Sequence, residues 1–302
     1  MIMKAILLSG AFAATATVPA DTHRAEVEAW QAQRLERLQR PDGWLSLVGL
    51  HWVETGTHAI GSAPGNDIVL ATGPARLGTL ESDGKTVKLA LADGVDARIG
   101  EGTDRSATLA SDATGKPTMV TFGSANFHVI ERSGRLALRV KDANAKSRTG
   151  FLGLDYYDID PSFRFDAKYI AHEPGRTIEI ANIIGTLDPM PNPGAVEFVK
   201  DGKTYRLEAV DEGDGQLFLI FADRTSGHQT YSAARFLYAD WPDAKNRTVV
   251  DFNKAYNPPC AFNSFSTCPL PPKQNRIKLT VVAGEKKYSG EAAEAPRKAP
   301  RP

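Results

Sequence analysis

The sequence contains only two cysteines, has no excess of either charge, and after residue 20 has no apolar run long enough to span a bilayer. Its 36 Lys and Arg residues balance 36 Asp and Glu residues, and no run of basic residues is present. We therefore expect no nucleic-acid partner and no other polyanionic partner. With 42% hydrophobic residues over 302 positions, the chain can form two modest domains or one large β domain.

Motifs that would define a reaction are also missing. The sequence has no GxSxG turn, HExxH motif, Walker A loop or EF-hand loop. His51 and His58 lie on either side of a hairpin signal at Glu54-Thr55-Gly56, so we expect them on the two arms of one hairpin. Two imidazoles without a third ligand make a poor metal site. We therefore expect neither a metal nor a cofactor.

The N-terminal residues 1–20 have the pattern of a signal peptide. One lysine precedes a short uncharged run of small and apolar residues, and small residues at positions 18 and 20 suit cleavage before Asp21. Export predicts a periplasmic or secreted protein that retains no integral membrane span after cleavage.

Cys260 and Cys268 are then expected to form a disulfide, because an oxidising compartment allows a nearby pair to persist in that form. Free thiols, metal ligands and a Cys260 nucleophile are the alternatives. The metal alternative lacks a nearby histidine, and the nucleophile lacks an identifiable base.

An amphipathic helix is predicted within residues 21–43. Charged residues surround an apolar face, and Pro41-Asp42-Gly43 ends the helical pattern. The predicted face consists of Val27, Trp30, Leu35 and Leu38.

The rest of the chain is predicted to be all-β, because short runs of branched and aromatic residues alternate with Gly, Asp and Asn clusters. We expect a β-sandwich domain over residues 44–148 and a larger sandwich or barrel with a proline-rich loop over residues 149–290. Residues 291–302 are expected to form a disordered tail. The expected hairpin turns are Asp83-Gly84, Ser133-Gly134, Asp201-Gly202 and Asp214-Gly215, and the last expected strand is 277–285.

The segment THAIGSAPGNDIVL resembles the opening of forkhead-associated domains, in which an I-G-R-type motif precedes a small loop and N-D-I-x-L. This resemblance implies a sandwich over about residues 44–141. Ser62 stands where those domains place a phosphate-binding arginine, and residues 74–81 lack their S-x-x-H segment. Phosphopeptide binding is therefore not expected.

A dense polar block lies between residues 221 and 275. It contains a D-x-T-x-G-x-x-T-Y…R-F-L segment, then D-F-N-x-A-Y-N-P-P-C-A-F and C-P-L-P-P-x-x-N. These motifs resemble those of the domain-of-unknown-function family 1684. The GWLSLVGLHW segment and Ile60-Gly61-Ser62 are also similar to that family, so the resemblance extends over nearly all of the mature chain. It implies membership of a group and no activity.

Prolines in this block fix φ and remove backbone donors, which predicts a rigid extended loop closed by the disulfide. Polar side chains held on a rigid scaffold can form a site for a small ligand. The same side chains could equally hydrogen-bond the loop backbone. The candidate ligand-binding residues are Asp223, Tyr231, Arg235, Asp251, Asn253, Tyr256, Asn257 and Asn275.

The function that we expect from the sequence is binding of a small polar ligand, such as a glycan or a metabolite of the cell envelope. One alternative is a hydrolase in which Asp251 works with Glu285 or Asp223 as acid and base. Another is a structural or interaction protein of the envelope. The sequence predicts neither the oligomeric state nor whether the protein is an enzyme.

Overall fold

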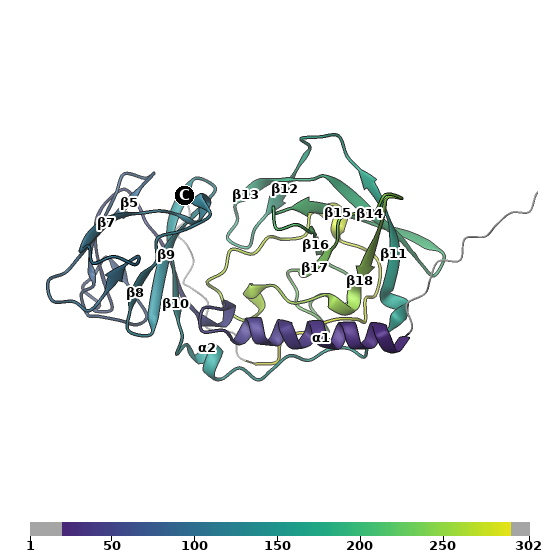
Figure 1. The fold of residues 1–302 in the computed structure, drawn as a ribbon, viewed down its shortest axis with the longest axis horizontal. Coiled ribbons are helices and arrows are strands. Elements are labelled where there is room, and N and C mark those ends of the chain that lie inside the picture. Colours follow the sequence, from purple (N-terminus) through teal and green to yellow (C-terminus); the bar gives the residue numbers. More distant parts are fainter. Residues whose placement is uncertain (1–19, 291–302) are drawn as a thin grey trace, which may run out of the picture.

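The computed structural model describes residues 20–290 as two β units joined along one helix (Figure 1). The predicted signal peptide, apart from Ala20, and the predicted tail lie outside the described residues. The helices are α1 (Ala20–Gln39) and α2 (Lys146–Thr149), with short 3-10 turns elsewhere. None of the helices within residues 20–290 has the length and apolar character needed to cross a membrane. The protein is mostly β, as predicted.

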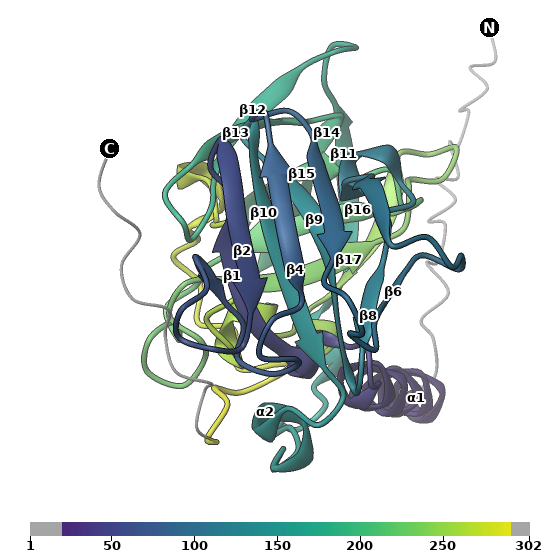
Figure 2. The ribbon, with the colours of Figure 1, turned by 90° about the vertical axis from the view of Figure 1, so that its left-hand side faces the viewer.

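The N-terminal unit is a sandwich of two five-stranded sheets, visible as two layers in Figure 2. One sheet has the order β1-β10-β9-β8-β6, and the other β3-β2-β4-β5-β7. The strands are β1 (Leu47–Trp52), β2 (Gly56–Gly61), β3 (Ile68–Val69), β4 (Gly78–Ser82), β5 (Val87–Leu91), β6 (Arg98–Ile99), β7 (Ser106–Leu109), β8 (Val120–Phe122), β9 (Ala125–Arg132) and β10 (Arg135–Asp142). Leu80 and Leu89 from one sheet and Phe127 and Leu138 from the other belong to one buried core, because alternate side chains of each strand point inward.

The first predicted hairpin is wrong. β1 pairs with β10 in one sheet, whereas β2 pairs with β3 and β4 in the other. The chain therefore crosses between the two layers at residues 53–55, and His51 and His58 lie in different sheets. The Ser133-Gly134 hairpin is confirmed, since β9 and β10 pair in full register on either side of it.

The C-terminal unit is built on one curled sheet with the order β17-β16-β15-β14-β11-β18. Its edge strands β17 and β18 contact each other, so the sheet wraps around its own core. A separate two-stranded sheet contains β12 and β13. The strands are β11 (Arg164–Ala171), β12 (Thr177–Ala181), β13 (Leu187–Pro191), β14 (Gly194–Lys200), β15 (Lys203–Asp211), β16 (Leu217–Phe221), β17 (Arg235–Ala239) and β18 (Arg247–Asp251).

Helix α1 precedes the sandwich in sequence but packs along the C-terminal unit (Figure 1). Its Arg34 donates to Glu285, and its Trp30 ring packs near Tyr256. The buried side of α1 differs from the predicted face: His23 and Arg34 are buried, whereas Leu35 is exposed. A 3.6-residue period explains this, because Arg34 is seven residues after the buried Val27 and four before the buried Leu38.

The last predicted strand is also wrong. Residues 277–283 alternate between buried and exposed positions as a strand would, but no part of 277–285 belongs to a sheet. Ile277 and Leu279 bond the backbone of Ala222 and Arg224. Further along, the Arg235 guanidinium donates to the carbonyls of Val281 and Ala283. These carbonyls bond a side chain in place of the backbone donors of a neighbouring strand.

Candidate functional site

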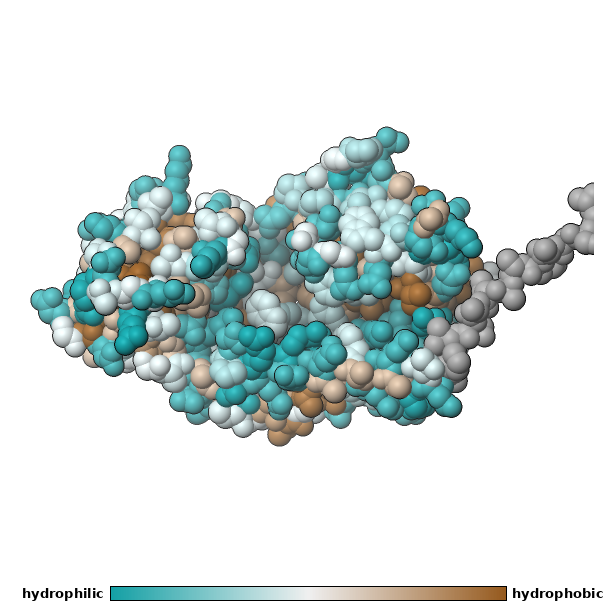
Figure 3. Space-filling model, in the orientation of Figure 1, coloured by the Kyte–Doolittle hydropathy of each residue, from teal (hydrophilic) through white to brown (hydrophobic). Residues whose placement is uncertain are grey.

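A large cleft lies between the sandwich, α1 and the C-terminal unit. Its volume is about 1280 Å³, and Figure 3 shows the surface hollowed between the two units above the helix. The walls come from one side of α1, from β9 and β10, from β12 and β13, from β16, β17 and β18, and from the disulfide loop. Ligand sites commonly occur at such junctions between structural units.

Aromatic side chains of the C-terminal unit and α1 form one side of the cleft, which we call the aromatic floor. It consists of Trp30, Phe218, Phe236, Tyr238 and Tyr256. Tyr238 stacks on Phe218 with ring centroids 4.8 Å apart, and its ring lies nearly parallel to that of Tyr256 at 6.3 Å. The floor therefore offers flat apolar surface with hydroxyl groups at its edge.

Charged groups border the aromatic floor. The Arg34 guanidinium lies 4.6 Å from the centroid of the Tyr256 ring, and the Tyr238 hydroxyl donates to Glu212 at 2.8 Å. Burial raises the pKa of both tyrosines, so their hydroxyls stay protonated and can donate. Glu212 is exposed as a whole residue. Its carboxyl is partly desolvated in the cleft, and this desolvation raises its pKa.

The sandwich contributes a second side of the cleft, which we call the cationic wall: Arg132 on β9 with Arg139 and Lys141 on β10. The Trp44 ring lies 5.6 Å from the Arg139 guanidinium carbon and 6.0 Å from Lys141 Nζ. No run of basic residues marks this wall in the sequence. Its charges gather because two paired strands turn alternate residues toward the same face.

The disulfide loop closes the cleft between these two sides. Cys260 and Cys268 are bonded, as predicted. Thr267 lies next to the bond, and its Oγ1 accepts from Arg139 Nη2 at 3.1 Å and from Arg132 Nε at 3.3 Å. The loop thereby joins the C-terminal unit to the cationic wall.

Two of the sequence-predicted residues, Asp251 and Tyr256, line the cleft. Asp251 ends β18, with Oδ2 lying 2.8 Å from Nε2 of the buried His23 on α1. Its other oxygen accepts from the backbone and side-chain amides of Asn253. The carboxylate is thus 4% exposed and already engaged on both oxygens.

Arg235 and Asp223 do not line the cleft. Their side chains form an ion pair at 2.8 Å inside the C-terminal unit. Asp223 also accepts from the backbone and hydroxyl of Thr225. Burial lowers the pKa of Arg235, whereas the Asp223 charge opposes that change.

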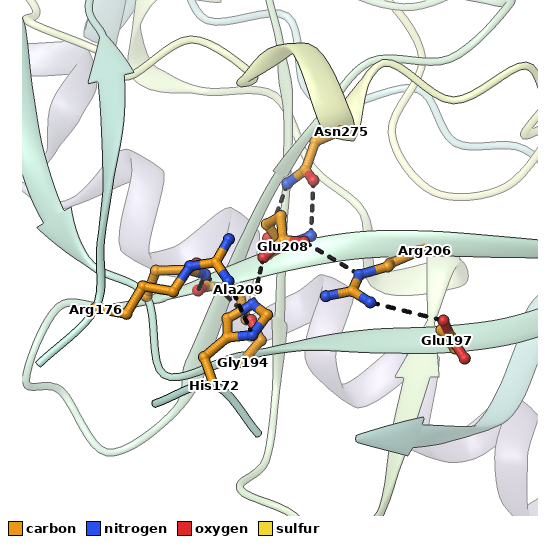
Figure 4. Close-up of polar contacts among 9 residues, drawn as sticks. His172, Arg176, Gly194, Glu197, Arg206, Glu208, Ala209 and Asn275 are labelled. Carbon is orange, nitrogen blue, oxygen red and sulfur yellow. Dashed lines mark hydrogen bonds and ion pairs between the residues drawn. The ribbon is translucent and has the colours of Figure 1, made fainter. Parts of the chain in front are cut away.

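The candidate asparagines also bond to backbone. Asn253 exchanges two hydrogen bonds with the backbone of Asp160, and Asn257 donates to the carbonyl of Lys286. Asn275 bonds the backbone N–H and carbonyl of Glu208 (Figure 4). The remaining candidate, Tyr231, donates to the carbonyl of Cys260 at 3.1 Å.

Figure 4 also shows a second polar network, away from the cleft. His172 Nε2 lies 2.7 Å from Glu208, which also receives Arg206 Nε at 3.1 Å. Burial raises the pKa of Glu208, but its hydrogen bond to His172 and the Arg206 charge outweigh that effect and the pKa is lowered. This network holds a charged carboxylate against the curled sheet.

The cationic wall and most of the aromatic floor were not predicted from the sequence. The alternation R-L-A-L-R-V-K over 135–141 does place Arg139 and Lys141 on one face of a strand. Nothing local indicates that this face meets a second unit. Within residues 20–290, no group of three or more His, Cys, Asp or Glu side chains is placed to hold a metal ion.

Comparisons with known proteins assign a family. No curated protein matches the chain. A solved structure that does match is the solution NMR structure of the uncharacterized protein from gene locus rrnAC0354 of Haloarcula marismortui, with 31% identity over 46% of this chain and 78% of that chain and a TM-score of 0.39. The family described as Protein of unknown function (DUF1684) matches residues 149–286. Through that region, the chain belongs to this family.

Proposed function

We propose that the protein binds a small polar ligand in the cleft between its two β units, and that it does so in the periplasm or outside the cell. The observation that carries the proposal is the convergence of the aromatic floor and charged side chains on one cavity of about 1280 Å³. Ligand sites combine apolar lining with a few convergent polar groups in this way.

The chemistry of the floor narrows the ligand class. The rings of Tyr238 and Tyr256 offer flat faces, while Glu212 and the tyrosine hydroxyls provide hydrogen-bonding groups beside them. A sugar ring or a heterocycle of a metabolite has the matching combination of a flat face and polar edges. The export proposal is supported by the signal-peptide pattern and by the disulfide.

The hydrolase alternative gains less support from the cleft. Of Asp251, Glu285 and Asp223, only Asp251 lines it. Glu285 is fully buried against Arg34, and Asp223 against Arg235. We therefore place binding ahead of hydrolysis for this cleft.

Native mass spectrometry tests the proposal. Protein produced with its full N-terminus is recovered from the periplasm, incubated with the small-molecule extract of the same cells, and measured in native and denatured form. We expect a native excess mass that Tyr238→Ala abolishes. Tyr205→Ala is the matched control, because Tyr205 also stacks on a phenylalanine, Phe198, but lies outside the cleft. No excess mass, or equal loss in both variants, would contradict the proposal.

A further inference from the structure

The cationic wall holds more positive charge than its surroundings neutralise. Arg139 is 6% exposed, and no carboxylate of residues 20–290 forms an ion pair with it or with Lys141. Arg132 alone has an acidic partner, Asp112, at 2.8 Å. Burying a cation without a partner is costly, so this arrangement needs an explanation beyond stability.

The hydrogen bonds of the wall are equally incomplete. The Thr267 hydroxyl is shared between two guanidinium groups, and Nε of Arg139 has no partner among the described residues. Lys141 Nζ donates to the backbone carbonyl of Asp42 at 2.6 Å, while the carboxylate of Asp42 is occupied by Arg40. Hydrogen-bond donors of the cationic wall therefore remain without a partner in the described part of the chain, on a surface that faces the cleft.

The electrostatics of neighbouring groups agree with this geometry. The pKa of Arg139 is lowered to about 10, first by burial and then by the Arg132 charge, with Asp112 opposing. His128, the register partner of Arg139 on β9, has a pKa lowered to about 4 by burial and by the charges of Arg139 and Lys141. Both pKa values are lowered in part by a positive potential, and a bound anion would reduce that potential.

We propose that the cationic wall binds an oxyanion of the ligand, a phosphate, sulfate or carboxylate group, through Arg139, Arg132 and Lys141. Arginine forks match such groups with paired, charge-assisted hydrogen bonds. This inference rests on the proposed function, because the wall and the aromatic floor line the same cleft. The ligand class is then a soluble small molecule with a flat ring at one end and an oxyanion at the other.

Titration of the full mature protein with inorganic phosphate, and in parallel with sulfate and acetate, tests the inference. Binding is followed by calorimetry at constant ionic strength and by the NMR signal of the Trp44 indole, which lies against the wall. We expect saturable binding of at least one anion in the wild type. Arg139→Gln should weaken it at least about ten-fold, as expected for a lost charge-assisted hydrogen bond.

Arg135→Gln is the matched control. Arg135 is on the same strand, but half of its side chain is exposed and it pairs with Glu54 over the Trp52 ring. This variant should bind within about two-fold of the wild type, as expected for a surface charge. No saturable binding of any of the three anions, or equal weakening in both variants, would overturn the inference.

Thermal unfolding separates a binding role from a structural one. Without added anion, Arg139→Gln should be at least as stable as the wild type, because it removes an unpaired buried charge. At the same concentration, the binding anion should raise the unfolding midpoint of the wild type clearly more than that of the variant. A clearly less stable variant, together with a wild type that the anions do not stabilise, would show that Arg139 is structural.

Two further measurements identify the source of the oxyanion and keep the two proposals apart. Glycerol phosphate should bind, whereas co-sedimentation with phosphatidylglycerol vesicles without binding of soluble anions would overturn the soluble ligand class. One outcome is that native mass spectrometry shows an uncharged ligand that the wild type binds and Tyr238→Ala does not. In that case, if no anion binds, the oxyanion inference fails and the proposed function stands. If nothing binds in the cleft, both fail.

Discussion

Arg235 and Asp223 form an ion pair whose two side chains are both 0% exposed, with Nη1 and Oδ2 2.8 Å apart. The same guanidinium donates to the carbonyls of Val281 and Ala283. One side chain thus neutralises a buried carboxylate and holds the segment 277–285 against the curled sheet.

Arg235→Ala should lower the free energy of unfolding by about 3–5 kcal/mol, because it leaves a buried charge without its partner. Urea denaturation measures the change. Arg247→Ala is the control, since the Arg247–Asp166 pair is partly exposed, and it should cost less than about 1 kcal/mol. Equal losses in the two variants would show that Arg235 has no special structural role.

The lowered pKa of His128 leads us to expect that the stability of the protein depends on pH. This pKa in the folded protein is about 4, lowered by burial, Arg139, Lys141 and Arg132 and opposed by Asp112, whereas histidine in an unfolded chain titrates near 6.5. The unfolded state therefore binds this proton more tightly. Stability from neutral His128 is fully present above about pH 6.5 and is lost as the pH falls toward 4.

We expect His128→Gln to flatten the fall in unfolding free energy across this window, measured by denaturant titrations at several pH values. His58→Gln serves as the comparison, because His58 lies on β2 in the other sheet and bonds the carbonyl of Glu54. An unchanged slope in His128→Gln would mean that other groups cause the pH dependence.

The disulfide gives a prediction for stability and for the cleft together. The Cys260→Ser, Cys268→Ser double variant opens a loop with a sequence separation of 8, and on the chain-entropy estimate it should lose about 2.5 kcal/mol of unfolding free energy. Because Thr267 bonds both Arg132 and Arg139, the variant should also bind oxyanions more weakly. An unfolding free energy equal to that of the wild type would contradict the first expectation, and an unchanged anion affinity in the double variant would contradict the second.

We expect that adding a side chain at Gly284 causes a steric clash with the backbone. The φ of Gly284 is +78°, and an added Cβ would lie 2.4 Å from the carbonyl oxygen of Ala255. Gly284→Ala should therefore destabilise well beyond the roughly 1–2 kcal/mol expected for left-handed strain alone. Gly215→Ala, at φ +90° with open space around the site, isolates that strain. Similar melting temperatures for both variants would contradict this account.

Local chemistry explains which parts of the structure could be predicted. The turn at Ser133-Gly134 has positive φ at both residues, and a two-residue turn of this kind is visible as a dipeptide. The Cys260–Cys268 bond was also predictable, because the short separation keeps the two thiols near each other. The all-β class follows from the same short-range patterns.

The cleft was not predictable, because it depends on contacts between distant segments. Arg139 meets Thr267 from 128 positions away, and no local pattern indicates that contact. Alternation over 277–283 is typical of a strand, but the carbonyls of Val281 and Ala283 bond the distant Arg235 side chain instead of a neighbouring strand. The DFNxAYNPPCAF block pointed to polar residues near the cleft, of which Asp251 and Tyr256 line it.

The position of α1 has a consequence for how the protein can be divided. The chain leaves this helix to form the sandwich and returns through α2, where Arg148 donates to the carbonyl of Gln39 and Ser147 to that of Leu45. The sandwich is therefore an insert attached by two adjacent connections. A protease that cut only one of them would leave both pieces tethered through the other, so releasing an isolated sandwich requires two cuts.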